Sequence, residues 1–364
     1  MTRETSAAPL RRAAELVAEG LIAGSQQARA EEVAVHFAIS LSRPLAALID
    51  PEDANDPIAR QFLPDAAELT ILPEERSDPI GDRTHSPCEG LVHRYPDRVL
   101  LKLITICPVY CRFCFRREMI GPGHEAHLSQ EALATALAYI AQHKEIFEVI
   151  LTGGDPLLLS ARRLGAVIAA LNAIAHVKIL RIHTRVPVAE PSLVNDALIG
   201  VLRQARQAVY VALHANHPRE LTQAALAACS KFIDAGIPML SQSVLLRGVN
   251  DSIEVLAELM RAFVAARIKP YYLHHPDLAR GTSHFRLTIA EGQALMRQLR
   301  GRLSGLCQPQ YMLDIPGGFG KAPVGPNFIG QSFVTKTGEA WDDTWTAEDF
   351  TGALHNYPPS LGEP

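Results

Sequence analysis

The sequence has no apolar run long enough to cross a bilayer, although 48% of its 364 residues are hydrophobic. It has no block of basic residues either, since 35 Lys and Arg against 39 Asp and Glu give a net charge of -4. Charged residues interrupt the stretch from Met1 to Gly20, so the apolar core of a signal peptide is missing there. We therefore expect a cytoplasmic protein without membrane or nucleic-acid partners.

Cysteine is also scarce, with six residues in the whole chain. Three of them are widely scattered, which fits neither a disulfide scaffold nor a second metal knuckle. The other three form one CxxxCxxC run directly after a strand-like stretch, and these are Cys107, Cys111 and Cys114. The distribution indicates a single metal-binding loop.

Three thiolates on one short loop suit an iron–sulfur cluster. A 4Fe–4S cube needs four ligands, so three cysteines leave one iron open for chemistry. The loop could instead bind zinc with a remote histidine, or belong to a disulfide framework. Zinc loops usually combine two CxxC pairs and this sequence has one, so we favour the cluster. The spacing is typical of radical S-adenosylmethionine (SAM) enzymes, which this chain resembles, and the resemblance implies that SAM fills the open position.

From Arg98 onward, short apolar runs alternate with amphipathic segments. The strands that we expect are 98–106, 148–152, 178–183, 208–213, 239–246 and 269–274. The helices that we expect lie near 129–144, 160–175, 191–205, 218–235, 252–266 and 288–303. Near-continuous apolar strands between helices predict a parallel sheet that is buried on both faces. Six βα units are too few for a closed eight-stranded barrel, so we expect an α/β fold with a partial (βα)6 TIM-like barrel, as the resemblance also implies.

The pattern differs on both sides of this core. Residues 1–62 look helical with an interruption at Pro44, and residues 64–96 are rich in proline and predict a strap over a domain surface. From about residue 305 the alternation of strand and helix ends. We therefore divide the chain into an N-terminal helical extension and strap (1–85), a barrel core (86–304) and a C-terminal segment (305–364).

Polar residues follow several of the predicted strands, at the edge where parallel α/β folds bind ligands. Gly153, Gly154 and Asp155 follow the second strand. The glycines would let the backbone approach a ligand, and Asp155 could accept a hydrogen bond from a ligand ammonium, although an ordinary turn suits the same residues. In radical SAM enzymes such an element contacts the SAM amino group. His214 and Gln242 follow later strands and are our candidates for contacts to the adenosyl part.

A glycine-rich element runs from Asp314 to Lys321. Its glycines and lysine resemble a Walker A motif, but that motif requires Ser or Thr after the lysine, and here Ala322 and Pro323 follow. Two readings remain open. The element is either a structural turn or a loop whose lysine amine forms a Schiff base with pyridoxal 5′-phosphate (PLP).

The cysteine loop and this lysine together resemble the lysine 2,3-aminomutases, which are PLP-dependent radical SAM enzymes. The resemblance covers roughly residues 55–335. Its motifs, in chain order, are HRYPDR (93–98), the cysteine loop with Arg116 and Arg117, LTGGDP (151–156), RIHTRVP (181–187), NHP (216–218), VLLRGVND (244–251) and DIPGGFGK (314–321).

The resemblance implies roles at the matching positions. Lys321 would hold PLP, with Tyr95 in the same site and with Arg94 and Arg98 on the phosphate, which suits planar guanidinium groups. Arg116 would bind the substrate carboxylate.

The distal ammonium of the substrate would lie between Asp277 and Asp314, since a buried ammonium needs opposite charge. A glutamate mutase would need a cationic or neutral group there. Arginine stays open as a substrate, because a guanidinium also pairs with carboxylates.

The sequence departs from the family in places. Phe113 stands where clostridial-type enzymes commonly have His, and His274 where they have Tyr. Because no cysteine follows Cys307, we expect no structural zinc. His274 and the segment 281–285 resemble the branch that makes β-lysine for elongation factor P, whereas the Asp314 element is typical of the other branch.

We therefore expect an isomerase, an L-lysine 2,3-aminomutase that uses a 4Fe–4S cluster, SAM and PLP, receives electrons from flavodoxin or ferredoxin, and forms a homo-oligomer. The alternatives are an aminomutase that supplies β-lysine for elongation factor P, and a family member that acts on another amino acid such as arginine. A non-catalytic iron–sulfur electron carrier is a third, but such a protein usually has all four cluster ligands.

Overall fold

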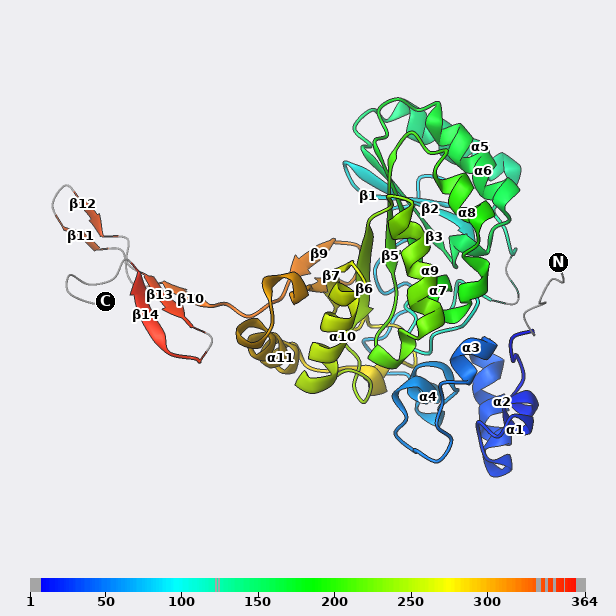
Figure 1. Cartoon of the computed structure of the whole chain (residues 1–364), viewed down its shortest axis with the longest axis horizontal. Helices are drawn as coiled ribbons and strands as arrows, with labels where there is room; N and C mark the ends of the chain where they lie inside the picture. The colour runs from blue at the N-terminus through cyan, green and yellow to red at the C-terminus, as the bar shows by residue number, and fades with distance from the viewer. Residues whose placement is uncertain are drawn as a thin grey trace.

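The computed structural model describes residues 8–121, 123, 125–331, 335–337, 340–342, 345–349 and 351–357. Its centre is a curved nine-stranded sheet in the order β1 to β9 (Figure 1). Strands β2 to β8 run parallel, and β1 and β9 pair antiparallel at the two edges. The strands are β1 (Leu91–Tyr95), β2 (Arg98–Ile104), β3 (Glu148–Gly153), β4 (Ile179–Thr184), β5 (Ala208–Leu213), β6 (Met239–Val244), β7 (Ile268–His274), β8 (Gln310–Asp314) and β9 (Lys321–Pro323).

Six main helices cover the convex side of this sheet (Figure 1). A Ser, Thr or Asn side chain caps each of them by accepting a hydrogen bond from a backbone amide of the first turn. The helices are α5 (Gln130–Gln142), α6 (Ala161–Asn172), α8 (Asp196–Leu202), α9 (Gln223–Asp234), α10 (Ile253–Ala265) and α11 (Ile289–Arg302). The prediction of a partial barrel with six βα units is confirmed, and β8 adds one more parallel strand.

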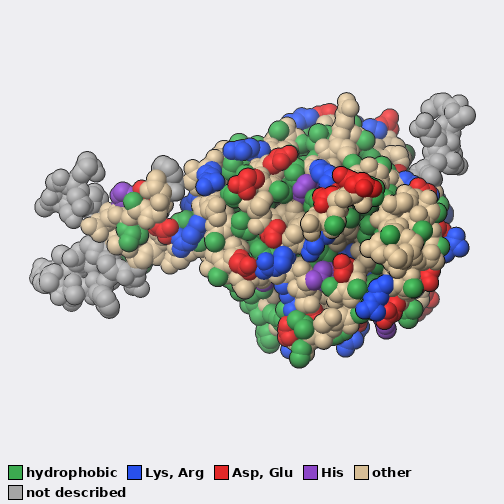
Figure 2. All heavy atoms as spheres, turned by 90° about the horizontal axis from the view of Figure 1, so that it is seen from below, with side chains coloured by type: hydrophobic (Ala, Val, Ile, Leu, Met, Phe, Trp, Pro, Cys, Tyr) green, Lys and Arg blue, Asp and Glu red, His purple; other side chains and the backbone are tan. Residues whose placement is uncertain are grey.

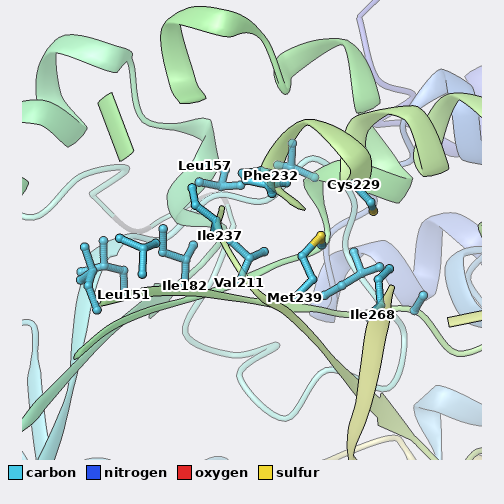
Figure 3. Packing of buried hydrophobic residues seen from close by; sticks show 14 of the residues in the cluster. Leu151, Leu157, Ile182, Val211, Cys229, Phe232, Ile237, Met239 and Ile268 are labelled. Atoms are coloured by element: carbon cyan, nitrogen blue, oxygen red, sulfur yellow. The ribbon is translucent and has the colours of Figure 1, made fainter. Parts of the chain in front are cut away.

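The two faces of the strands differ in chemistry, because side chains alternate across a sheet. Leu151, Ile182 and Val211 point toward the helices and pack against residues such as Phe232 of α9 (Figure 3). Their neighbours Thr152 and His183 lie on the opposite, concave face. The hydrophobic core therefore fills the helix side, and the concave side is left for polar groups.

The N-terminal extension forms a second, smaller core beside the barrel (Figure 1). Pro44 does not simply break the predicted helix, since it sits in the first turn of a new one, where its missing N–H costs nothing. Val109 of the cysteine loop packs into this core. The elements here are α1 (Ala13–Ala18), η1 (Gly24–Gln26), α2 (Gln27–His36), α3 (Arg43–Ala46), α4 (Pro57–Phe62) and η2 (Ala66–Leu69).

Short elements fill the connections between the main ones. They are η3 (Pro156–Leu158), α7 (Val186–Ala189), η4 (Pro191–Leu193), η5 (Pro218–Glu220), η6 (Ser283–Phe285) and η7 (Gly305–Cys307). No helix among the described residues is long and apolar enough to span a membrane. On the face shown in Figure 2, basic and acidic side chains are interspersed.

The C-terminal segment first continues the barrel sheet with β8 and β9 and then leaves it. A three-stranded antiparallel sheet and a hairpin project away from the barrel (Figure 1). Their strands are β10 (Ile329–Gln331), β11 (Thr335–Thr337), β12 (Ala340–Asp342), β13 (Trp345–Glu348) and β14 (Leu354–Tyr357). The division of the chain at residues 85 and 304 stays a prediction.

Candidate functional site

A cavity of about 400 Å³ lies on the concave side of the sheet. Every residue that the sequence analysis assigned to the site lines this one cavity, although the residues come from widely separated parts of the chain. They are Arg94, Tyr95, Arg98, Cys107, Cys111, Cys114, Arg116, Gly153, Gly154, Asp155, His214, Gln242, Asp277, Asp314 and Lys321. Their individual roles stay predictions, but the structure places them in a single site.

The two glycines after β3 hold the entrance of the cysteine loop. The Gly154 amide donates to the carbonyl of Ile104 at 2.5 Å, and the Asp155 amide donates to the carbonyl of Ile106 at 2.9 Å. A Cβ atom on Gly154 would overlap the carbonyl oxygen of Ile106, and Gly153 has a φ of +113°. The glycines thus admit the backbone that leads into the loop, whereas the sequence suggested that they make room for a ligand.

The Asp155 carboxylate ties the end of β3 to the end of β4. It accepts hydrogen bonds from the Thr184 hydroxyl at 2.8 Å and from the Arg185 and Val186 amides at 2.7 and 3.1 Å. Its predicted contact to a ligand ammonium would share oxygens that these protein donors already use. Asp155 therefore has a structural function as well, namely to fix the cavity edge beside the cysteine loop.

The three loop thiols belong to half-buried cysteines, line the cavity and are suited to a metal cluster. Burial raises the pKa of Cys111 to about 12, and burial also raises the pKa values of Cys107 and Cys114. Without bound iron these thiols are therefore neutral, and cationic iron would favour their deprotonation. Within the described ranges, no three His, Cys, Asp or Glu side chains are placed to bind one metal ion. Three soft sulfur donors on one loop fit a 4Fe–4S cluster with one open iron.

Two arginines between and after the cysteines anchor the loop. The Arg112 guanidinium donates to the fully buried carboxylate of Glu68 at 2.6 and 2.9 Å, and Arg117 pairs with the same carboxylate. Burial alone would raise the pKa of Glu68, but the charges of Arg112 and Arg117 outweigh it and lower that pKa. Glu68 on η2 thus links the loop to the N-terminal extension, a role that nothing in its sequence context indicated.

Lys321 begins β9 and faces Asp314 at the end of β8. Its Nζ atom lies 2.5 Å from Oδ1 of Asp314, and its backbone amide donates to the hydroxyl of Tyr95 at 2.6 Å. The turn between the strands needs glycine, because Gly317, Gly318 and Gly320 all have φ near +90°. An accessible lysine amine, an adjacent tyrosine and two nearby arginines are a donor set that fits PLP.

Asp277 and Asp314 form the acidic end of the cavity. Burial, with a further contribution from the charge of Asp314, raises the pKa of Asp277 to about 8. Burial would also raise the pKa of Asp314, but the His274 and Lys321 side chains outweigh it and lower that pKa. One carboxylate is thus ionised and the other is readily protonated while the cavity holds only the Lys321 ammonium.

Positively charged side chains surround Asp82, a fully buried residue of the strap to which the sequence assigned no role. Arg94 donates to Oδ1 of Asp82 at 3.0 Å. Nε of Arg116 donates to Oδ2 at 3.0 Å, and Nη2 lies 2.9 Å from the same oxygen. Arg98 stacks over Tyr95, with its Cζ atom 3.8 Å from the ring centroid. The cavity therefore has a cationic end and an acidic end.

Several polar atoms of the cavity wall lack a partner. Among the described side chains, Nε2 of His183, Oε1 of Gln242 and Nε2 of His274 are buried without a hydrogen bond. Burial lowers the pKa of His214 to about 3, so this ring stays neutral. Buried polar groups are normally satisfied, so these wall residues indicate a polar ligand.

Comparison with known proteins gives consistent relationships. The family model described as the radical SAM superfamily matches residues 101–260. The chain is 43% identical over 282 residues to an L-lysine 2,3-aminomutase of Clostridium subterminale, which covers 78% of this chain and 67% of that protein. It is 41% identical over 302 residues to a putative L-lysine 2,3-aminomutase of Aquifex aeolicus, with 83% and 80% covered. It is also 36% identical over 299 residues to a glutamate 2,3-aminomutase of Clostridioides difficile, with 82% and 70% covered.

Proposed function

Because the chain belongs to the L-lysine 2,3-aminomutase family of radical SAM proteins, we propose that it is an isomerase that converts L-lysine to β-lysine. One observation carries the choice of substrate. The acidic end of the cavity already holds an alkylammonium group, the Nζ of Lys321 against Asp314. A lysine side chain ends in the same group, so Asp314 could pair with a substrate ammonium as it pairs with Lys321 in this structure.

The two ends of the cavity match the two ends of lysine. Arg116 would bind the α-carboxylate in a two-pronged pair, and Asp277 and Asp314 would bind the side-chain ammonium. A glutamate side chain would instead bring a carboxylate to the ionised Asp314, which is repulsive at short range. On this ground we propose lysine and not glutamate as the substrate, although the chain is also similar to a glutamate 2,3-aminomutase.

The family implies a 4Fe–4S cluster and SAM, and we propose PLP as the third cofactor. When bound, the cluster with SAM supplies a radical that takes hydrogen, and PLP supplies a π-system that carries the migrating nitrogen. Cys107, Cys111 and Cys114 would hold the cluster, while Gly153, Gly154, Asp155, His214 and Gln242, which line the same cavity, would contact SAM. Lys321, Tyr95, Arg94 and Arg98 would hold PLP.

The chain's own residues fix the substrate at both ends, which restricts it to orientations in which its reacting carbons face the cofactors. Use of Lys321 Nζ to hold PLP would remove a positive charge from Asp314. Both carboxylates would then be left for the substrate ammonium. Lys321 would hold PLP, and Asp314 lies within hydrogen-bond distance of its Nζ.

We also propose a cytoplasmic location, an electron donor such as flavodoxin or ferredoxin, and a homo-oligomer. An exposed iron vertex is sensitive to oxygen and needs a reducing compartment, which supports the first two. Light scattering of the purified protein tests the third.

The test of the function is an anaerobic assay of protein reconstituted with iron, sulfide, PLP and SAM. Lysine, arginine and glutamate are supplied separately, and the products are resolved by chiral chromatography. We expect β-lysine from lysine. The configuration of this product also distinguishes free-lysine metabolism from elongation factor P modification. Turnover of glutamate or arginine without turnover of lysine would overturn the proposal.

A further inference from the structure

We infer that Asp82 is a positioning residue that orients Arg116 for the carboxylate of an amino-acid ligand and couples it to Arg94. The inference rests on the proposed function, because it concerns the same cavity. Asp82 lies on the strap before β1, is fully buried, and does not itself line the cavity. Its effect on a ligand therefore passes through the two arginines, which do line it.

The hydrogen bonds of Arg116 show what Asp82 leaves available. Oδ2 of Asp82 accepts a hydrogen bond from Nε of Arg116 at 3.0 Å and lies 2.9 Å from Nη2 in the same ion pair. The Thr152 hydroxyl accepts from Nη1 at 3.2 Å. A guanidinium has five N–H donors, so these two hydrogen bonds leave three within the part of the chain that the structure describes, with at least one on each terminal nitrogen. Two such donors are what a carboxylate binds in a bidentate pair.

The charges lead to the same conclusion. Arg94 and Arg116 are both buried and share one carboxylate, so the group retains one positive charge. Burial alone would raise the pKa of Asp82, but Arg116 and Lys102 outweigh it and lower that pKa, which keeps Asp82 ionised. A buried, uncompensated positive charge is costly, and an anionic ligand group would neutralise it.

The strap also connects these arginines to the lysine turn. The Ile80 carbonyl accepts a hydrogen bond from Arg94 at 2.6 Å, and Gly81 lies so close to Gly317 and Gly318 that a Cβ atom on Gly81 would overlap their backbone. A single short segment thus contacts the carboxylate-binding group and the turn that leads to Lys321.

The test uses Asp82→Asn and two probes that each carry half of lysine. L-Norleucine has the α-carboxylate but no side-chain ammonium, and 1,5-diaminopentane has the two amines but no carboxylate. Dissociation constants come from the change in visible absorbance when each probe is added to PLP-loaded protein without SAM. We expect norleucine to bind about tenfold or more weakly to the variant, as for loss of hydrogen bonds to a charged group, and diaminopentane to bind as to the wild type. Equal weakening of both probes, or no weakening of norleucine, would overturn the inference.

Asp56→Asn is the matched control. Asp56 is also fully buried and paired with an arginine, Arg219 at 2.7 Å, but it caps α4 away from the cavity. This variant should bind both probes as the wild type does. Should Asp82→Asn not fold, Thr152→Val removes the hydroxyl that accepts a hydrogen bond from Arg116 while keeping the side-chain shape. It should weaken norleucine alone by a few-fold, and an equal effect on both probes would count against the inference.

The outcome is independent of the test of function. Every α-amino acid carries the same carboxylate, so the contrast between the probes persists even if the substrate is not lysine. If lysine is not turned over but Asp82→Asn still weakens norleucine alone, only the proposed function is rejected. If β-lysine forms but Asp82→Asn does not weaken norleucine alone, only the role of Asp82 is rejected.

Discussion

Nζ of Lys321 lies 2.5 Å from Oδ1 of Asp314, its direct partner across the β8–β9 pair. The ion pair joins the residue proposed to hold PLP to a residue proposed to hold the substrate. While Lys321 is an ammonium, Asp314 is occupied, and loading of the cofactor would free it. The proposed cofactor and substrate sites would thus be electrostatically linked through one carboxylate.

Asp314→Asn should nearly abolish lysine turnover. The amide has the shape of the carboxylate but cannot balance an ammonium in an enclosed site, so kcat/KM should fall by about 100-fold or more. Iron and sulfide contents should stay at the wild-type level, because Asp314 is not among the proposed cluster ligands and the substitution keeps its shape. Asp234→Asn, which breaks only the exposed pair with Arg267, is the control and should keep full activity. Normal turnover by Asp314→Asn would refute the proposed ammonium site.

The affinity for lysine should depend on pH through Asp277, whose pKa is raised to about 8 by burial and then by the charge of Asp314. Only the deprotonated form attracts an ammonium, so the KM for lysine should fall as the pH rises toward 8, by at most about tenfold per pH unit. In Asp277→Asn this trend should disappear. Because its pKa is raised, Asp277 keeps its proton in the folded protein at pH values between the ordinary carboxyl pKa and about 8. In the unfolded chain the same carboxyl has lost its proton in that pH range. Asp277 therefore costs the empty protein stability as the pH rises through that range. A wild-type KM that is flat with pH would contradict this account.

Gly154→Ala should prevent loading of the cluster, because its Cβ would collide with the Ile106 carbonyl at the entrance of the cysteine loop. We expect a loss of about 1–3 kcal/mol in stability, as for overpacking, together with a reduced iron content. In the control Gly165→Ala, on α6, the added Cβ meets Val201 at 3.7 Å, an ordinary contact. That variant should gain about 0.5–1 kcal/mol, since Gly is unfavourable within a helix. Chemical denaturation and iron analysis measure both effects.

Cys111→Ala should remove most of the iron and sulfide and should abolish turnover, while the PLP absorbance band remains. Its thiol lines the cavity and is one of only three that the loop offers to a cluster. Cys88→Ser is the matched control, because Cys88 lies outside the loop and outside the cavity wall. It should keep its iron. Full iron loading of Cys111→Ala would mean that the cluster is bound elsewhere.

The repeating part of the fold was readable from the sequence. Each of the six predicted strands and six predicted helices is present, because continuous apolar runs and capped amphipathic helices are local signals. Strands β1, β8 and β9 of the barrel sheet were missed, and so were β10 to β14 of the C-terminal segment. The three strands of the barrel sheet are short, β8 lies between Pro309 and the glycine-rich turn, and their pairing is set by the barrel edges to which they bind.

The site residues likewise fall into two groups, those that the sequence reveals and those that only the fold reveals. The cysteine loop and Lys321 stand out because their motifs are local in sequence. Asp82 and Glu68 do not, since a single carboxylate in an irregular segment is informative only when one sees which arginines the fold brings to it. The Gly153–Gly154 pair was recognised, but the need for glycine there arises because the chain after β2 passes close to its backbone. Only the tertiary structure shows this contact.

The position of Lys321 on the last strand of the sheet has a consequence for biosynthesis. A ribosome releases the chain from its N-terminus, so the cysteine loop and strands β1 to β7 emerge well before this lysine. The proposed cluster ligands can thus come together while the lysine proposed to hold PLP is still being translated, so a cluster would be able to load before PLP does.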